Sequence, residues 1–134
     1  MAEDGAKGEP GVVTKLSPRA VADTAARLVD ILGARGVKLF GVIDQAAEAH
    51  QAGLQLRDTI LVIFGNPAAG TPVMAASPMA ALDLPLKVLV WDDTGQTKVS
   101  YYAPAELAAR HRLGPGLEKN LAAIDVLTDA LVGP

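Results

Sequence analysis

The chain of 134 residues contains no cysteine, which excludes disulfide bonds, thiolate metal sites and cysteine nucleophiles. A chain without cysteine fits a reducing compartment, and we expect a cytoplasmic location. Aromatic residues make up only 4% of the chain. The core must therefore be built from aliphatic side chains, and few rings are present to stack on nucleic-acid bases.

Long apolar runs are also missing. Half of the residues are hydrophobic, yet no run approaches the roughly 18 apolar residues that a membrane-spanning helix needs. The first residues, Met1 to Gly5, are acidic and are not followed by an apolar segment, so we expect no secretory signal. These features predict a protein without membrane contact.

A basic face is the third missing feature. The formal net charge is −3, and the 12 lysine and arginine residues are scattered along the chain. Only Arg110, His111 and Arg112 form a locally basic group, near the expected end of a helix, where cations complement the helix dipole. Nucleic-acid binding needs basic residues gathered on one face, so we expect no nucleic-acid partner.

The patterns that are present predict one domain. Residues 1–10 contain two glycines and a proline and predict a flexible leader, whereas residues 11–134 predict a single α+β domain. Apolar residues recur at three- and four-residue steps in two long segments, so we expect long helices at about 18–35 and 116–132. Ser17 and Pro18 are the expected N-cap and first residue of the first of these helices.

Strand patterns at about 12–16, 37–44, 57–64, 86–91 and 98–102 predict a two-layer sandwich, with a mainly antiparallel sheet and the long helices on one face. The string Asp92-Asp93-Thr94-Gly95 is typical of a hairpin turn. The unbroken apolar run Ile60–Phe64 predicts an interior strand with both faces covered. Helices on one side leave the other sheet face open, and a second copy of the chain would cover it, which favours a homodimer.

The best candidate for a site follows this apolar strand. Gly65 and Gly70 have the spacing of a phosphate-binding loop, but the diagnostic lysine is absent and Pro67 lacks a backbone donor. In one interpretation the segment is structural: Asn66-Pro67 makes a turn, Gly70 takes a positive φ, and Thr71 begins a helix. In the other, backbone N–H groups at this helix start hold an anionic or polar ligand.

Three titratable side chains lie near predicted turns: Asp44, His50 and Asp83. A histidine with two carboxylates suits metal binding or acid–base chemistry. However, His50 lies six residues after Asp44, so the two do not share a helix face. Asp44 is equally suited to cap the following helix, and Asp83 to a turn. We therefore expect no metal and no cofactor, and keep a small cofactor-independent hydrolase or isomerase as the alternative.

Several strings, read together, resemble the bacterial and archaeal domain-of-unknown-function 302 family over about residues 37–113. The resemblance implies an α+β fold related to the TATA-binding-protein-like group, usually a dimer, and no established activity. Relatives often carry Asp-His where this chain has Asp44-Gln45, and Gln45 can hydrogen-bond but cannot titrate. The strings are Val42-Ile43-Asp44-Gln45, Ala52-Gly53-Leu54, Ile63-Phe64-Gly65-Asn66-Pro67, Gly70-Thr71-Pro72, Asp83-Leu84-Pro85-Leu86-Lys87 and Val90-Trp91, with Ser100-Tyr101 and Arg110-His111 later in the chain.

The sequence thus predicts a dimeric, non-catalytic binding module for a small anionic or polar ligand. A partner domain without a ligand, which uses the open sheet face for protein contact, remains the further alternative. The expected ligand-binding residues are Asn66, Gly70 and Thr71 in the lining of the site, with Asp44, Gln45 and Asp83 at its rim.

Overall fold

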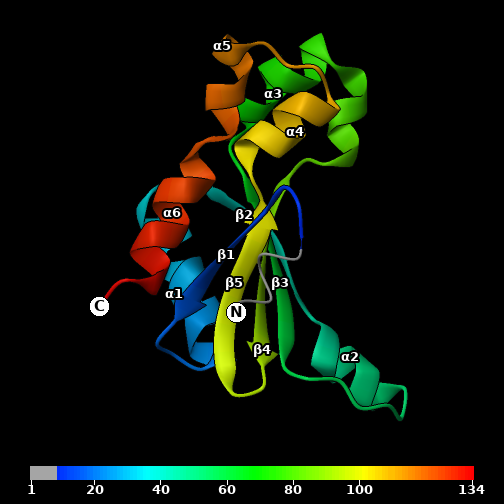
Figure 1. Ribbon diagram of the computed structural model, residues 1–134, viewed down its shortest axis with the longest axis vertical. Coiled ribbons are helices and arrows are strands. Elements are labelled where there is room, and N and C mark those ends of the chain that lie inside the picture. Colours follow the sequence, from blue (N-terminus) through cyan, green and yellow to red (C-terminus); the bar gives the residue numbers. More distant parts are fainter. Residues whose placement is uncertain (1–8) are drawn as a thin grey trace.

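A computed structural model describes residues 9–134, and the predicted leader lies outside this range except for Glu9 and Pro10. Five strands form one antiparallel sheet in the order β1-β5-β4-β3-β2, as Figure 1 shows. The predicted α+β class with a five-stranded antiparallel sheet is confirmed. The strands are β1 (Val12–Ser17), β2 (Lys38–Asp44), β3 (Thr59–Gly65), β4 (Leu86–Asp93) and β5 (Gln96–Tyr102).

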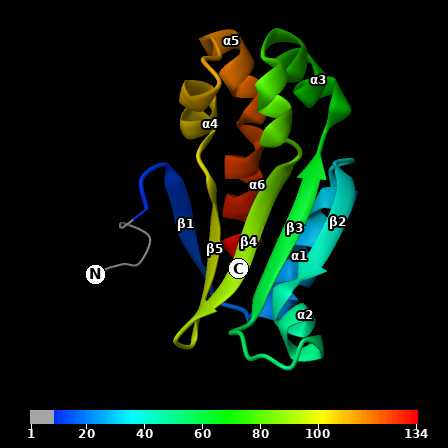
Figure 2. The same ribbon diagram turned by 90° about the vertical axis from the view of Figure 1, so that its right-hand side faces the viewer.

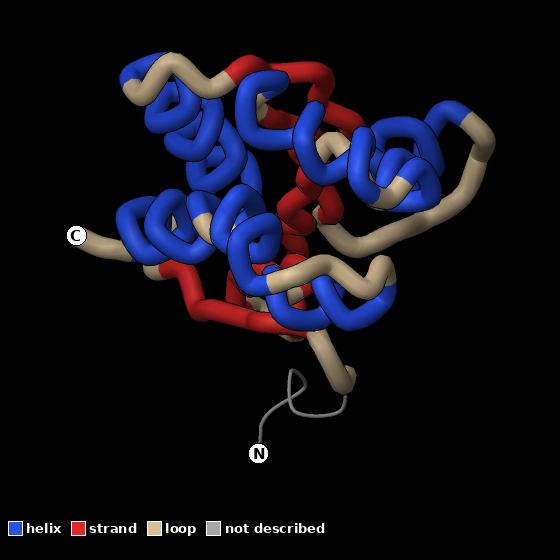
Figure 3. Tube along the Cα trace, turned by 90° about the horizontal axis from the view of Figure 1, so that it is seen from above, coloured by secondary structure: helices blue, strands red, loops and turns tan. Residues whose placement is uncertain are grey.

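Two long helices, α1 (Val21–Ala34) and α6 (Ala123–Val132), cover one face of the sheet (Figures 1 and 2). The short helix α2 (Gln45–Gln51) lies at the lower end of the sheet in Figure 1, where the β4–β5 hairpin also turns. The other helices gather at the upper end, where Figure 3 shows helices in front of the strands. These are α3 (Pro67–Ala76), η2 (Pro78–Leu82), α4 (Pro104–Arg110), α5 (Pro115–Glu118) and η3 (Lys119–Leu121).

The core between the sheet and the two long helices is mainly aliphatic, as the scarcity of aromatic residues predicted, and Phe64 and Tyr101 are its buried aromatic residues. Leu28 and Leu32 of α1 and Leu131 of α6 are fully buried against strand valines such as Val62 and Val90. These leucines recur at the helical period and the valines at the strand period, so each element presents one apolar face to the other layer.

The first helix begins later than predicted. Ser17 is the last residue of β1, and Ala20 is the N-cap of α1, without a side-chain hydrogen bond. The Ser17 hydroxyl lies instead within the protein, 2.7 Å from the Thr24 hydroxyl, and accepts the backbone N–H of Arg19. Burial of this hydroxyl against α1 outweighs its local tendency to cap.

The predicted helix at 116–132 is interrupted: α5 and η3 precede α6, and Ala122 lies between η3 and α6. The apolar stripe is continuous in sequence but serves two clusters. Leu121 packs with Val73 and Leu107 in the upper cluster, whereas Ile124 packs into the main core. The chain changes from a short 3₁₀ segment to α-helix between these two clusters.

The β4–β5 hairpin is confirmed, with Thr94 and Gly95 between the strands at φ values of 48° and 95°. Such positive φ values at both central residues are typical of the two-residue turns that join twisted strands. The apolar strand, β3, is interior, but only one of its faces is covered by helices. Val62 and Phe64 face the core, whereas Leu61 and Ile63 remain partly exposed on the open sheet face in front of the viewer in Figure 2.

Candidate functional site

The segment after β3 folds differently from the sequence prediction. Helix α3 begins at Pro67 rather than at Thr71, and Asn66 is its N-cap, with the Asn66 Oδ1 accepting the Ala68 N–H at 3.0 Å. Gly70 lies inside the helix, donates its N–H to the Asn66 carbonyl at 2.9 Å, and has no positive φ. The predicted turn at Gly70 is therefore wrong: a proline at the first helical position starts a helix well, and Asn66 supplies the cap.

This geometry leaves little room for an anion at the start of α3. Pro67 has no N–H, the Ala68 N–H is bound by the cap, and the Ala69 N–H is bound by the Asn66 carbonyl at 2.9 Å. An anion site at a helix start depends on N–H groups that point at the ligand without other partners. The backbone of α3 does not provide such groups.

Beside α3 lies a half-open groove with a volume of about 400 Å³, which we call the α3 groove. Its lining includes Phe64 and Gly65 of β3, Gly70 and Met74 of α3, and Leu127 of α6. A Cβ placed on Gly70 would lie 3.8 Å from the Met74 Cε and 3.9 Å from the Leu84 Cδ1. Met74 and Leu84 also line the groove, so a side chain larger than alanine at Gly70 would enter it.

Three polar side chains line the α3 groove: Asn66, Thr71 and Asn120. Asn120 donates from Nδ2 to the Ala69 carbonyl at 3.0 Å, which fixes its carboxamide plane. Among residues 9–134, no hydrogen bond engages the Asn120 Oδ1, the Asn66 Nδ2 or the Thr71 hydroxyl. The groove therefore combines an apolar lining with one acceptor, one amide donor and one hydroxyl that are available to a ligand.

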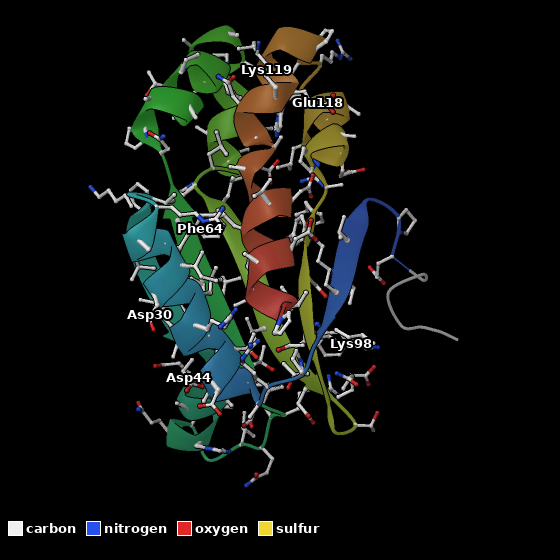
Figure 4. All side chains as sticks on the ribbon, turned by 90° about the vertical axis from the view of Figure 1, so that its left-hand side faces the viewer. Asp30, Asp44, Phe64, Lys98, Glu118 and Lys119 are labelled. Carbon is white, nitrogen blue, oxygen red and sulfur yellow. The ribbon has the colours of Figure 1, made fainter. Side chains whose placement is uncertain are left out.

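The structure separates the predicted site residues into two groups. Asn66, Gly70 and Thr71 line the α3 groove at the upper end of the sheet, whereas Asp44 and Gln45 lie at the lower end, where β2 meets α2. Figure 4 shows Asp44 near one end of the molecule and Phe64, two residues before Asn66, well away from it. Because β2 and β3 are antiparallel, Asp44 at the end of β2 lies beside the start of β3, whereas Asn66 follows the end of β3.

Asp44 caps a helix, which was the alternative interpretation of this residue from the sequence. Its Oδ1 accepts the Ala47 N–H at 2.9 Å and caps α2. His50 lies on α2 at the same lower end, whereas Asp83 lies at the upper end, three residues before β4. The predicted acid–base trio of Asp44, His50 and Asp83 is therefore not assembled in this chain. In the described range, no group of three or more acidic or histidine side chains is placed to hold a metal ion.

Asp83 belongs instead to an ion cluster that joins η2 to α4. The His111 Nε2 lies 2.6 Å from the Asp83 Oδ2, and the Arg110 Nη1 donates to both Asp83 carboxylate oxygens at 3.1 Å. Arg110 also binds Glu106 at 3.0 Å and stacks over the Tyr102 ring. Burial opposes ionisation, but the hydrogen bonds from His111 and Arg110 hold the pKa of Asp83 below its usual value.

The sequence analysis assigned Arg110 and His111 to the end of a helix and so missed this cluster. The two residues do end α4, but they face a carboxylate that lies 27 and 28 residues earlier in the chain. The strings Asp83-Leu84-Pro85 and Arg110-His111 were the available signal, and only the packing of η2 against α4 brings them together. Asn120, for its part, carried no signal in the sequence.

The fold and the groove define an antiparallel α+β sandwich with a half-open pocket at one end of the sheet. Residues 13–131 match the family described as "Domain of unknown function DUF302", and the chain belongs to this family. A solved structure entitled "Crystal structure of uncharacterized conserved protein DUF302 from Bacillus stearothermophilus" superposes with a TM-score of 0.77. The match covers 92% of this chain and 97% of the chain in that structure, at 20% sequence identity. At this low identity the likeness supports the fold alone.

Curated relatives with the name "Fluoride-specific ion channel FluC" are also similar. The protein from Brucella suis biovar 1 is 40% identical over 107 residues, which are 79% of this chain and 42% of that protein. The corresponding proteins of Brucella abortus biovar 1 and Brucella melitensis biotype 1 match with the same identity over 40% of their length. This chain thus spans about two fifths of these relatives. None of the helices in residues 9–134 has the length and apolar character to cross a membrane.

Proposed function

We propose that this chain is a non-catalytic domain that binds a small molecule in the α3 groove. The observation that carries the proposal is the combination of a mostly apolar, half-open groove of about 400 Å³ with a few polar groups at one side. Small-molecule sites have this anatomy: an apolar lining buries the body of the ligand, and a small number of polar groups fix its orientation.

The lining favours an uncharged ligand over the anion expected from the sequence. No lysine, arginine or histidine lines the α3 groove, and the N–H groups at the start of α3 already have partners. Asn66, Thr71 and Asn120 offer donors and an acceptor, which suit an amide or another polar group with both functions. We therefore propose a ligand with an apolar body and one amide-like end.

Binding rather than catalysis follows from the same lining. The residues that form the α3 groove include no aspartate, glutamate, histidine, lysine or tyrosine. General acid–base catalysis needs a titratable side chain within hydrogen-bonding reach of the substrate, and the groove does not supply one. The alternative of a hydrolase or isomerase needs His50 beside Asp83 or Asp44. His50 and Asp83 lie at opposite ends of the sheet, and Asp44, at the same end as His50, caps α2 through the Ala47 N–H.

Benzamide is a suitable probe because it joins an apolar ring to an amide. Titration followed by amide NMR shifts should give saturable changes centred on Gly70 and Thr71. Asn66→Ala and Thr71→Ala should each weaken binding about tenfold, since each removes one ligand hydrogen bond. Gly70→Leu should abolish it by filling the groove, whereas Thr14→Ala on β1, outside the groove, should not. Equal affinity in the wild type and Gly70→Leu would refute the site.

We propose further that the chain forms a homodimer through its open sheet face. Strand register places Ile43, Leu61 and Leu89 in one row across this face, and Ile43 is 38% exposed. Apolar rows on an open sheet are typical of association surfaces. Leu61→Glu should shift sedimentation toward the monomer, while Val126→Glu on exposed α6 should not. A wild type that sediments as a monomer contradicts this part of the proposal.

A second function is favoured by the channel relatives. Because the match covers about two fifths of proteins that are named as fluoride channels, we propose that this chain acts as a partner of such a channel in its own host. Loss of the chain should then lower the fluoride concentration that the host tolerates, and re-expression should restore it. Unchanged fluoride tolerance after loss of the chain would exclude this function.

A further inference from the structure

A second opening lies between β4 and β5, and it shares the lining residue Leu86 with the α3 groove. The ladder between these strands ends at the pair Leu89–Ser100, although β4 extends up to Leu86 and β5 extends up to Tyr102. Above that pair, each strand stays with its outer neighbour: Leu86 pairs with Phe64 on β3, and Tyr102 pairs with Val12 on β1. Figure 2 shows the two strands diverging toward the upper end, with α6 visible between them.

This divergence creates a half-open slot of about 380 Å³ through the upper part of the sheet, which we call the β4–β5 slot. Its back is apolar and is formed by Leu86, Leu107 and Ile124. Its mouth opens on the uncovered sheet face, where Lys87 and Tyr102 lie. The slot is large enough for a small molecule, and its apolar back would bury a hydrocarbon body.

Lys87 is the charged group in the slot that lacks an opposite charge. Its ammonium donates to the Pro85 carbonyl at 2.9 Å and lies 3.4 Å from the Asp83 carbonyl, so the chain holds it in place while at least one N–H is left for a ligand. Within residues 9–134, Lys87 forms no ion pair, whereas Lys15 and Lys98 each do.

The other charged group that lines the slot already has side-chain partners. The Asp83 carboxylate lines the slot but is bound by Arg110 and by His111. Arg110 in turn has Glu106 as its second partner. Within residues 9–134, the Lys87 ammonium is therefore the charged group of the slot without a side-chain partner. A carboxylate complements a half-buried ammonium better than any neutral group does, because charge-assisted hydrogen bonds are the stronger ones.

We propose that the β4–β5 slot binds an apolar monocarboxylic acid, with the carboxylate on the Lys87 ammonium and the hydrocarbon body against Leu86 and Ile124. The proposal does not rest on the α3 groove, because Lys87 is not part of that groove. It assigns to Lys87 a binding role in addition to its place in the sheet.

Isothermal titration with octanoate tests this inference. The wild type should bind octanoate, and hexanoate, which is two methylenes shorter, should bind about 15-fold more weakly, since each buried methylene contributes about fourfold. Lys87→Met should weaken octanoate binding by about tenfold or more, and Lys87→Arg should keep it. Lys119→Met, which removes an exposed lysine outside both openings, is the matched control.

The comparison with 1-octanol isolates the charge. Octanol should bind the wild type and Lys87→Met equally, because it lacks the carboxylate that Lys87 would hold. Gly70→Leu should leave octanoate binding unchanged, so this result separates the slot from the α3 groove. Octanoate that binds Lys87→Met as tightly as the wild type, or that does not bind the folded wild type, would overturn the inference. The slot opens on the sheet face proposed for dimer contact. All titrations therefore use a protein concentration at which the protein has a single oligomeric state.

Discussion

Substitution of Gly70 by alanine tests whether Gly70 lies within a helix, as in the structure, or in a turn, as expected from the sequence. If Gly70 required a positive φ, alanine would strain the backbone and destabilise the protein. In the structure Gly70 is an interior residue of α3 with an ordinary helical hydrogen bond, so the backbone accepts alanine. The added methyl would lie 3.8 and 3.9 Å from Met74 and Leu84 side-chain atoms, which is ordinary van der Waals contact.

Two effects then stabilise Gly70→Ala. Alanine is favoured over glycine in a helix interior by about 0.8–1.0 kcal/mol. The new methyl adds part of the roughly 0.8 kcal/mol that a buried methylene contributes, reduced because Gly70 lies at a half-open groove. We expect an increase of about 1 kcal/mol in the free energy of unfolding, measured by urea denaturation with an unchanged slope.

Gly36→Ala is the matched control. Gly36 follows α1 with a φ of 67°, and no atom lies within 4 Å of the position of its Cβ, so any cost there comes from the backbone alone. We expect a loss of about 1 kcal/mol in this variant. A destabilised Gly70→Ala variant would refute the placement of Gly70 within a helix and restore the predicted turn.

Three further variants test the elements around the site. Asn66→Ala removes the N-cap of α3 and should cost about 1 kcal/mol of stability in urea denaturation, and a cost near zero would contradict the cap. Leu28→Ala empties a fully buried position and should cost about 2–5 kcal/mol, whereas Val126→Ala at a 57% exposed position should change stability little. Asp83→Asn should reduce the pH dependence of the free energy of unfolding. Because the pKa of Asp83 is lowered in the folded protein, its ion cluster stabilises the protein above the usual carboxylate pKa, and this stability is lost as the pH falls through the folded pKa. Equal acid sensitivity of wild type and Asp83→Asn in pH-dependent unfolding would show that the cluster does not stabilise the fold.

The periodicity of apolar residues in the sequence predicted the layers of the fold, but it did not predict where the helices begin and end. The helix at 18–35 was expected because Leu28 and Leu32 recur at the helical step, and both are buried in α1. Its start was placed too early because Ser17 resembles a cap, and only tertiary packing shows that its hydroxyl is buried against Thr24. The break between η3 and α6 was invisible for the same reason: one apolar stripe serves two separate clusters.

The candidate site was predicted in part. Asn66, Gly70 and Thr71 do line one groove, because they are close in sequence and local turn chemistry marks such a segment. Asp44 and Gln45 were added to them from residue type alone, and the antiparallel pairing of β2 with β3 places them at the other end of the sheet. Asn120 and the partners of Asp83 come from distant helices, and spacing along the chain contains no information on such contacts.

Native mass spectrometry of the purified wild type and Gly70→Leu, each compared with its denatured mass, tests the ligand-binding role of the α3 groove most directly. We expect the native wild type to carry a small molecule as excess mass that is missing from Gly70→Leu, purified in parallel. The same spectra count the subunits, and the proposed homodimer should appear in both samples. A wild type that carries no mass beyond that of Gly70→Leu, and that also gives no benzamide shifts, would contradict the claim that this groove binds a ligand.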